Sequence, residues 1–467
     1  MILSAYEVTL KIPDHVFREY DIRGIVDQDL SNDFAYLLGR AYARLAKENG
    51  KNNISVGHDC RITSPAYAKS LMQGIAAEGI NTIFSGMGPT PQLYYSIFAK
   101  NYGGGIQVTG SHNPSNMNGF KICIGTRTLS GADIQDLKNR MHELSKTKPS
   151  EISGLITEDN IQKNYISELL SNSKKSIGPR KLKVVVDAGN GVGGMVGPEL
   201  LRGLGVEVIE LFCEPDGTFP NHHPDPTEPK NLKDLINKVR ETKADLGIGW
   251  DGDADRIGAV DENGTVIFGD MLLLIFAREI LKTVPNATII ADVKCSEYLF
   301  KDLNSKGAKA IMWKTGHSLI KSKLKETNGE LGGEMSGHIF FKHRFYGFDD
   351  ALYASARLVE IVSNSTIPVS KLLADLPERV STPEIRVDCP EEKKFKIVEK
   401  AQLAFSEYKV NTIDGVRISF EKGWGLIRAS NTQPVFVMRF EAENKTLLDQ
   451  YQKIVVDKIE TIKESLA

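Results

Sequence analysis

The sequence predicts an α/β protein of several domains, in which three similar mixed-sheet α/β domains precede a smaller C-terminal α+β domain. Its 467 residues exceed the roughly 250 to 300 at which a single hydrophobic core stops growing. Strand-like runs alternate with helical patterns over roughly the first 370 residues, which is typical of βαβ units and mostly parallel sheets. After Pro383 the order changes to a strand, a long helix from about Glu391, three strands and a final helix, which indicates a separate α+β domain.

Three blocks of alternating pattern are visible, and each carries a polar motif at the end of a strand. The first block contains ISVGHD, the helical SPAYAKSLMQGIAAEG, NTIFSG and GGGIQVTG; the second contains KLKVVVDAGNG, VEVIELF and ADLGIGWDG; the third contains ATIIADVK, KAIMWK and ELGGEMSGHIFF. Ligands of open α/β sheets bind beyond the carboxyl ends of the strands. We therefore expect the three motifs to converge on one cleft.

Polar stretches that contain Pro or Gly predict the domain boundaries. SKTKPSEISG at 145–154 and SNSTIP at 363–368 are the clearest, whereas a boundary near 260 rests on the strand pattern alone. We therefore expect domains at residues 1–155, 156–262, 263–374 and 375–467.

The composition is that of an ordinary globular protein, with 41% hydrophobic and 25% charged residues. The net charge of −2 argues against a nucleic-acid partner, and no apolar run approaches the roughly 18 residues of a membrane span. The first residues, MILSAYEVTLKIPD, lack the basic start and cleavage site of a signal peptide. The five cysteines are odd in number and form no CxxC pair, which is typical of reduced thiols. We expect a cytoplasmic protein without nucleic-acid or membrane partners, and the oligomeric state stays open.

Two short motifs far apart in the chain together predict a phosphoryl-transfer site. TGSHNP places Ser111 in a tight Gly/Asn/Pro turn that should present its hydroxyl to solvent. DGDADR gathers Asp251, Asp253 and Asp255 within five residues, and these carboxylates would repel one another without a divalent cation between them. Ligand sets made of oxygen alone favour Mg²⁺ or Ca²⁺. A serine in a polar turn is by itself more often only a turn residue, so the prediction needs both motifs.

A phosphoryl group on Ser111 would add about −1.5 to −2 charge beside the three carboxylates. Such a site needs a dication and basic side chains, for which Arg256 and Lys121 are the nearest candidates along the chain. The metal would bridge the carboxylates and a phosphoryl oxygen and neutralise charge as the group moves. Lys121, in GFKICIG, would on its own be interpreted as a solvated strand residue.

The acidic run also overlaps the template of an EF-hand calcium loop, with Asp251, Asp253, Asp255 and Glu262 at positions 1, 3, 5 and 12. Two features exclude that interpretation. Position 6 is Arg256 where the template requires Gly, and the preceding ADLGIGW has the pattern of a strand where an EF-hand has a helix.

Two further motifs are suited to phosphosugar binding, although each is weak alone. In GEMSGH, Glu334 and Ser336 stand at alternate positions and would face the same way along an extended chain, which suits the recognition of sugar hydroxyls. In RASNTQP an Arg fork, two hydroxyls and turn amides could surround a phosphate, with Arg428 at its start. By itself, a Glu and a Ser on one strand face are more often solvent-facing, and RASNTQP is as readily an ordinary polar turn.

Two other features receive no role in this hypothesis. VVVDAGNGVGG, with Gly189, Gly191 and Gly194, imitates a dinucleotide fingerprint, but the glycines are explained as well by close strand-to-helix packing. His222 and His223, in PNHHPDP, stay unassigned, because adjacent side chains in an extended chain point in opposite directions.

The ordered set FREYDIRG, TGSHNP, DGDADR, GEMSGH and RASNTQP resembles the α-D-phosphohexomutase family, most closely its bacterial phosphomannomutase/phosphoglucomutase branch. The likeness covers almost the whole chain, and five motifs in the right order argue against coincidence. The resemblance implies three similar α/β domains and a fourth, smaller α+β domain that line one deep cleft. It also implies that the serine, here Ser111, is phosphorylated in the resting enzyme and passes that group to a hexose phosphate.

The resemblance carries roles to individual positions of this chain. The implied ligands of Mg²⁺ are Ser111, Asp251, Asp253 and Asp255. The implied contacts of the sugar hydroxyls are Glu334 and Ser336, with His338 in the same motif. The implied site for the phosphate that is not being transferred comprises Arg428, Ser430, Asn431 and Thr432. The positions implied to surround the substrate are Tyr20, Arg23, Lys121, Lys294 and His317, with Lys121 and His317 as acid/base candidates and Arg23 and Arg256 as catalytic cations.

The resulting hypothesis is reversible movement of phosphate between the 1 and 6 positions of mannose or glucose, through a hexose 1,6-bisphosphate that turns round in the cleft. Closure of the cleft by the last domain should exclude water. A phosphoglucosamine mutase is the alternative within the class, and Met335 in GEMSGH argues for the hexose branch. A metal-dependent sugar phosphatase and a catalytically silent phosphosugar-binding protein are the alternatives outside it.

Overall fold

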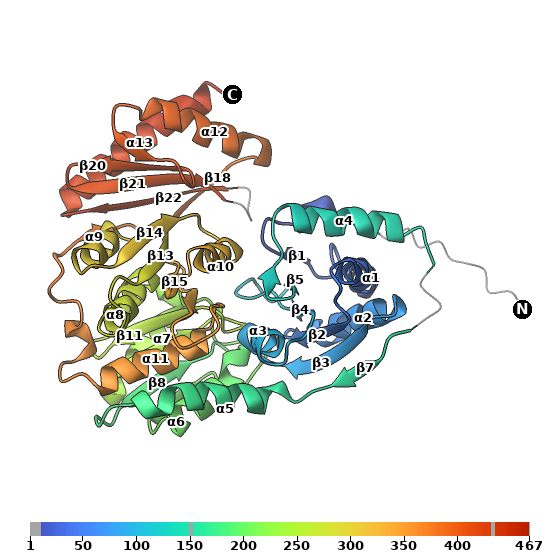
Figure 1. Cartoon of the computed structure of the whole chain (residues 1–467). Coiled ribbons are helices and arrows are strands. Elements are labelled where there is room, and N and C mark those ends of the chain that lie inside the picture. The colour runs from blue at the N-terminus through green and yellow to red at the C-terminus, as the bar shows by residue number, and fades with distance from the viewer. Residues whose placement is uncertain (1–10, 149–152, 431–434, 467) are drawn as a thin grey trace, which may run out of the picture. The chain divides into compact units, whose positions relative to one another are not determined.

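The computed structural model describes residues 11–148, 153–430 and 435–466, and Figure 1 labels their helices and strands. The chain divides into two compact units. The first unit contains the chain up to Val266 together with Phe348–Thr366. The second contains Ile267–Gly347 and the chain from Ile367 onward. The described residues form four sheets, two of them in each unit.

The first sheet has seven strands in the order β1-β5-β4-β2-β3-β7, with β6 paired to β5. Strands β4, β2, β3 and β7 run parallel, whereas β5 is antiparallel to both β4 and β1, so the sheet is mixed. Its strands are β1 Ile22–Ile25, β2 Asn53–His58, β3 Asn81–Met87, β4 Gly104–Val108, β5 Met117–Ile124, β6 Arg127–Thr128 and β7 Ile156–Glu158. Its helices are α1 Asn32–Glu48, α2 Ser64–Ala77, α3 Thr90–Ala99 and α4 Ala132–Leu144.

Helices α1 and α2 pack backbone to backbone at one crossing. A Cβ on Gly74 would lie 1.9 Å from the carbonyl oxygen of Tyr36, and a Cβ on Gly39 would lie 2.2 Å from that of Leu71. Any larger side chain at either glycine would therefore push the helices apart and open the core beneath them.

The second sheet has the order β12-β11-β10-β8-β9, in which β9, β8 and β10 are parallel and β11 returns antiparallel to β10. Its strands are β8 Lys183–Asp187, β9 Glu207–Leu211, β10 Leu246–Trp250, β11 Ile257–Asp261 and β12 Val266–Ile267. Its helices are α5 Ile161–Ser173, α6 Gly197–Gly203 and α7 Lys233–Thr242. Helix α11 (Ala351–Ser363) contacts α5, α6 and β11, so the chain returns to the first unit after completing the third sheet (Figure 1).

The second unit contains one mixed sheet and one antiparallel sheet. The mixed sheet has the order β14-β13-β15-β16, with β13 Thr288–Asp292, β14 Lys309–Trp313, β15 Leu331–Gly333 and β16 Ile339–Phe341. Its helices are α8 Gly269–Leu281, α9 Glu297–Ser305 and α10 His317–Glu326. The antiparallel sheet comprises β17 Val380–Ser381, β18 Ile385–Asp388, β19 Lys409–Asn411, β20 Val416–Phe420, β21 Gly423–Ala429 and β22 Val435–Ala442, covered by α12 Glu391–Ala404 and α13 Lys445–Glu464.

These sheets confirm the predicted fold class, three mixed-sheet α/β domains and a smaller C-terminal α+β domain. One local prediction is wrong. ELGGEMSGHIFF is a hairpin rather than one extended strand, because Gly337 takes a positive φ of 88° and its N–H donates to the carbonyl of Glu334 at 3.0 Å. Glu334 and Ser336 therefore lie in a turn, and the alternation of an extended chain does not apply to them.

Two features predicted from the composition concern disulfides and membrane-spanning helices. None of the five cysteines takes part in a disulfide, as their number and spacing predicted. Across residues 11–148, 153–430 and 435–466, no helix has the length and apolar character needed to cross a membrane.

Asp350 gives the first unit a pH dependence that can be measured. Its carboxylate caps α11 by accepting hydrogen bonds from the backbone N–H groups of Leu352 and Tyr353 at 3.0 and 2.9 Å, and from the hydroxyl of Tyr165 at 2.7 Å. Burial raises the pKa of Asp350 to about 7, although these hydrogen bonds oppose the shift. The folded protein thus holds a proton that the unfolded chain releases near pH 4, so stability is lost as the pH rises from about 4 to about 7.

The variant Asp350→Asn keeps a capping oxygen but cannot ionise. We expect its melting temperature to exceed that of the wild type by several degrees at pH 8 and by clearly less at pH 5, as calorimetry would show. A difference of the same size at both pH values would mean that Asp350 does not carry the extra proton.

Candidate active site

Ser111 lies in the loop that follows β4, in a left-handed backbone conformation with φ 49°. Its hydroxyl donates to Asp251 Oδ2 at 2.8 Å and lies 3.1 Å from His112 Nδ1, while its N–H donates to Thr109 Oγ1 at 2.8 Å. The residue is only 1% exposed, so the expectation of a hydroxyl presented to solvent is wrong. The turn is covered because the loop after β10 packs on it, which the local pattern of Gly, Asn and Pro does not reveal.

The three predicted carboxylates lie in the loop between β10 and β11, and all are fully buried. Ala254 in this loop takes a positive φ of 57°, which turns the chain sharply between Asp253 and Asp255. Asp251 Oδ1 accepts hydrogen bonds from two backbone N–H groups of the same loop, those of Asp255 at 3.1 Å and Arg256 at 3.0 Å. The strand before the loop is the one predicted from ADLGIGW, so the EF-hand alternative fails in the structure as it did in the sequence.

Lys121 on β5 lies against this cluster. Its ammonium donates to Asp253 Oδ2 at 2.7 Å and also pairs with Asp255. Burial alone would lower the pKa of Lys121, but the charges of Asp253 and Asp255 outweigh it and raise that pKa above its ordinary value. The same lysine lowers the pKa of Asp253 despite burial and the repulsion of Asp255, whereas burial and its two acidic neighbours raise the pKa of Asp251. Lys121 is therefore an integral part of the cluster rather than a solvated strand residue.

The acidic cluster fits a hard divalent cation on two observations. One carboxylate oxygen from each of Asp251, Asp253 and Asp255 lies within 4.8 Å of the others. Asp253 Oδ1 is buried and has no hydrogen-bond partner, which is costly for a carboxylate oxygen unless a ligand completes it. Oxygen donors of this kind match the preferences of Mg²⁺.

The cations predicted around Ser111 belong to the same unit. Arg23 on β1 donates to the carbonyl of Gly110 at 3.0 Å and to Asp21 at 2.7 Å, and β1 pairs with β5 so that Arg23 stands opposite Gly119, two residues from Lys121. Although burial opposes it, the attraction of Asp21 raises the pKa of Arg23, with smaller contributions from Asp253 and Asp255. Arg256 follows the acidic run directly, and Tyr20 is buried two residues before β1.

Sequence reasoning missed two side chains that touch this cluster. The hydroxyl of Thr90, the first residue of α3, donates to Asp253 Oδ2 at 2.5 Å, and its N–H donates to the Asp253 carbonyl at 2.9 Å. His112 stands inside the TGSHNP motif but received no role. Thr90 offers no local signal, since a threonine before a proline at a helix start is common, whereas the adjacency of His112 to Ser111 was a usable one.

The remaining predicted residues belong to the second unit. Glu334 accepts a hydrogen bond from the N–H of Gly316 and lies 2.6 Å from His338 Nδ1, and the ring of His338 lies 5.8 Å from that of His317. Burial would raise the pKa of Glu334, but the hydrogen bond and charge of His338 lower it to about 2. Ser336, at the tip of the same hairpin, is half-buried.

Two basic side chains flank this group. Lys294, just after β13, pairs with Glu384 at 3.1 Å and lies 4.0 Å from Asp292. Arg428 on β21 donates to Asp414 at 3.0 Å, and Asp414 also accepts from the N–H of Thr315 at 3.0 Å. Ser430 is buried at the end of β21, and Asn431 and Thr432 lie outside the described residues.

The two motifs left without a role have structural explanations. After β8 the chain turns through Gly189, with φ 50°, into a 3₁₀ segment at Val192–Met195, whereas a dinucleotide site would begin an α-helix there. A Cβ on Gly191 would lie 2.7 Å from the carbonyl oxygen of Gly252, so this glycine permits close packing on the acidic loop. His222 lies 3.1 Å from both carboxylate oxygens of Asp187, at the end of β8.

Four family models match successive parts of this chain. They are Phosphoglucomutase/phosphomannomutase alpha/beta/alpha domain I at residues 14–148, domain II at 163–264, domain III at 268–380 and the C-terminal domain at 384–458. The chain belongs to the phosphoglucomutase/phosphomannomutase family. This membership confirms the resemblance drawn from the five ordered motifs.

Individual relatives agree with the family assignment. The chain is 46% identical over 452 residues to a phosphomannomutase/phosphoglucomutase of Pseudomonas putida, covering 96% of both chains. It is 44% identical over 441 residues to a phosphoglucomutase of Neisseria meningitidis serogroup A, covering 94% of this chain and 95% of the relative. A crystal structure of a phosphoglucomutase/phosphomannomutase family protein from Burkholderia thailandensis superposes with a TM-score of 0.90 at 40% identity, covering 97% and 98% of the two chains. An N-acetylglucosamine-phosphate mutase in its substrate complex, at 13% identity and a TM-score of 0.62, shares the fold.

Proposed function

We propose that this protein is a phosphohexomutase that interconverts hexose 1-phosphate and hexose 6-phosphate of mannose and glucose, with Ser111 as the phosphoryl carrier. One observation carries the proposal. The hydroxyl of Ser111 lies 2.8 Å from Asp251 in a buried cluster of three carboxylates and a lysine, so the proposed nucleophile and the proposed metal ligands are neighbours. The membership of the family and the names of relatives at 44 to 46% identity support the same activity.

The proposed reaction has two phosphoryl transfers of opposite direction. In the first, the bond between phosphorus and Ser111 Oγ breaks while a bond forms to the unphosphorylated hydroxyl oxygen of the hexose phosphate, whose proton passes to a base. In the second, the hexose 1,6-bisphosphate has turned round. The bond between its other phosphorus and the sugar oxygen breaks, a bond forms to Ser111 Oγ, and the base returns the proton to the sugar oxygen. One serine thus serves both ends of the sugar, and the bisphosphate is both intermediate and activator.

Charge balance explains why the site would need Mg²⁺. A phosphoryl group on Ser111 adds about −1.5 to −2 to the charge of the carboxylates. Lys121 offsets one of these charges. Arg23 bonds the residue before Ser111, and Arg256 directly follows the three carboxylates in the chain. Asp251, Asp253 and Asp255 would hold the cation, with Ser111 beside them. When bound, the cation neutralises charge on the phosphoryl oxygens.

The protein's own side chains would handle the protons and the sugar. Lys121 is held protonated, so it is suited to stabilise negative charge on the transferring group. His317 is suited to take up and return the proton of the sugar hydroxyl, because imidazole titrates near neutral pH. In the second unit, Glu334, Ser336 and His338 would bind sugar hydroxyls, and Lys294 and the segment from Arg428 through Ser430, Asn431 and Thr432 would bind a substrate phosphate. In the first unit, Tyr20 would be a further substrate contact.

Turnover assays separate this proposal from its alternatives. We expect rapid conversion of both α-mannose 1-phosphate and α-glucose 1-phosphate to the 6-phosphates, and slow conversion of glucosamine 6-phosphate. Preferred turnover of the glucosamine substrate would indicate a phosphoglucosamine mutase, and steady release of inorganic phosphate would indicate a phosphatase. Tight binding without turnover would leave a phosphosugar-binding protein. The reduced cysteines suit a cytoplasmic enzyme.

Replacing Glu334 tests the sugar-binding role. The variant Glu334→Gln loses the charge that pairs with His338 and offers the sugar a weaker acceptor. We expect kcat/KM for both hexose phosphates to fall about 10- to 100-fold, the loss that corresponds to one charge-assisted hydrogen bond of about 1.5 to 3 kcal/mol. The matched control Glu326→Gln removes an exposed pair with Lys323 on α10 and should change neither constant. An unchanged kcat/KM in Glu334→Gln would exclude Glu334 from sugar binding.

A further inference from the structure

A buried arginine, Arg61, donates hydrogen bonds to the backbone carbonyls of the loop that contains Ser111. Its guanidinium donates through Nη2 to the carbonyls of Ser111 at 2.8 Å and Asn113 at 2.6 Å, and through Nη1 to those of Pro114 at 2.6 Å and Met117 at 2.9 Å. Its Nε donates to Asp59 at 3.2 Å, so all five N–H donors of a guanidinium are used. The side chain is only 1% exposed, so these protein groups, and not water, satisfy its hydrogen bonds.

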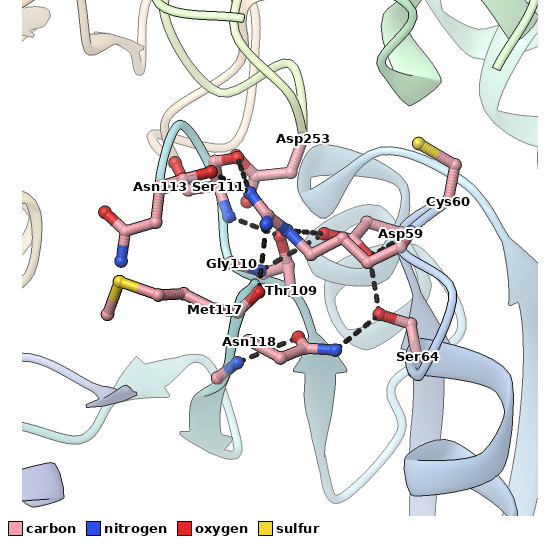
Figure 2. Close-up of polar contacts among 12 residues, drawn as sticks. Asp59, Cys60, Ser64, Thr109, Gly110, Ser111, Asn113, Met117, Asn118 and Asp253 are labelled. Carbon is pink, nitrogen blue, oxygen red and sulfur yellow. Dashed lines mark hydrogen bonds and ion pairs between the residues drawn. The ribbon is translucent and has the colours of Figure 1, made fainter. Parts of the chain in front are cut away.

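Asp59 extends the same network to the strand that carries Lys121. Its carboxylate accepts from the N–H of Gly110 at 3.2 Å and from the hydroxyl of Ser64 at 2.5 Å. The side-chain amide of Asn118 donates to Ser64 at 3.0 Å, and its oxygen accepts from the N–H of the next residue in β5 at 2.8 Å. Figure 2 shows this chain of bonds running from the serine loop through Asp59 and Ser64 to Asn118.

The fit between the loop and the arginine is tight on both sides. A Cβ on Gly110 would lie 2.4 Å from Arg61 Nε, so only glycine lets the loop approach the guanidinium this closely. The guanidinium also lies over the ring of Phe219, 5.0 Å from its centre. The chain just before Phe219 packs closely on the backbone before Arg61, because a Cβ on Gly217 would lie 2.4 Å from the carbonyl oxygen of Cys60. The segment around Phe219 thus covers the arginine and keeps water from its bonds.

We propose that Arg61 and Asp59 are positioning residues, which fix Ser111 Oγ at one place so that it can both give and receive a phosphoryl group. The proposal rests on the carrier role proposed for Ser111. The left-handed φ of 49° at Ser111 costs roughly 1 to 2 kcal/mol, so the loop keeps it only because its carbonyls are turned inward and bonded. Neither residue is one of the predicted site residues, and the hydrogen bonds of Arg61 go to the backbone of the serine loop and to Asp59.

Lysine cannot replace this arginine, because an ammonium has three donors and no planar fork. The variant Arg61→Lys keeps the charge but leaves carbonyls of the loop unbonded. We expect kcat to fall about 100-fold, the loss that a displacement of about 1 Å causes, while KM changes less than about threefold. Phosphate on Ser111 should also be lost to water faster, measured as release of label from the phosphoenzyme without sugar.

Arg40 provides a matched control in the same unit. It is also buried and pairs with Glu78 at 2.8 Å. It donates to the carbonyls of Leu144 at 3.1 Å and Thr147 at 2.9 Å, which lie at and just after the end of α4 and not in the serine loop. The variant Arg40→Lys should lower the melting temperature and leave kcat of the folded protein unchanged. A purely structural role for Arg61 would give its lysine variant the same result as Arg40→Lys.

A second variant tests the same contact from the loop side. Gly110→Ala retains Arg61 but forces its guanidinium away, so it should show the same loss of kcat and the same faster loss of phosphate even if Arg61→Lys does not fold. Wild-type kcat in either folded variant would overturn the proposal. Failure of the proposed function itself would look different, because the wild-type protein would then hold no phosphoserine and show no mutase turnover.

Discussion

Replacing Ser111 with glycine should abolish hexose phosphate interconversion while the protein stays folded. The variant removes the only atom proposed to carry phosphate, and glycine accepts the left-handed φ of 49° without strain. We expect kcat to fall at least about 10⁴-fold, as when a nucleophile is deleted from other enzymes. The measurement is coupled turnover of α-glucose 1-phosphate, with the melting temperature recorded beside it.

Two comparisons separate the lost chemistry from a damaged loop. Ser111→Ala should be equally inactive but less stable than Ser111→Gly, because alanine pays the left-handed penalty. Ser96→Ala, which removes another buried hydroxyl that is bonded to Ser55 at 2.8 Å in the same unit, should retain activity. Substantial turnover in both Ser111 variants would exclude this serine as the carrier.

Replacing Asp253 with asparagine should have the second-largest effect. Asp253 bonds Lys121 and Thr90 through Oδ2 and leaves Oδ1 without a partner, so it is central to the proposed metal site. The amide removes a charge and puts a donor where a cation would need an acceptor. We expect kcat/KM to fall roughly 10²- to 10³-fold and the Mg²⁺ concentration for half-maximal rate to rise at least about tenfold.

Asp261→Asn is the matched control, because Asp261 is also buried and lies at the far end of β11, where it accepts from Asn263 and Thr265 at 2.9 and 2.8 Å. It should alter stability but not the dependence on Mg²⁺. An unchanged Mg²⁺ midpoint in Asp253→Asn would contradict the assignment of the metal site. Removal of Mg²⁺ from the wild type by a chelator should stop turnover reversibly.

Much of the fold follows from local pattern. Runs such as VEVIELF and ATIIADVK became β9 and β13, because dense β-branched residues bounded by turns favour strands. The short strands β17 and β19 were not predicted, since only their pairing with β22 and β20 defines them. The return of α11 to the first unit was also not predicted. All residues of this helix are buried, and its apolar sequence does not indicate which elements it packs against.

Part of the candidate site could likewise be predicted from local pattern, and part could not. Ser111, Lys121 and the three aspartates were predicted from motifs whose residue types imply their chemistry. Thr90 and Arg61 were not, because their roles depend on contacts with residues 163 and 50 positions away that no local pattern encodes. The prediction of one extended strand through Glu334 and Ser336 was wrong for a related reason, since the single positive φ of Gly337 ends the alternation of the strand.

The most direct test of this account is the phosphorylation of Ser111. The purified protein would be loaded with glucose 1,6-bisphosphate and Mg²⁺ and digested, and the peptide that contains Ser111 would be analysed by mass spectrometry before and after addition of hexose phosphate. The account predicts phosphate on Ser111 that the sugar removes within one turnover. Phosphate on another residue, or phosphate on Ser111 that hexose phosphate does not discharge, would contradict it.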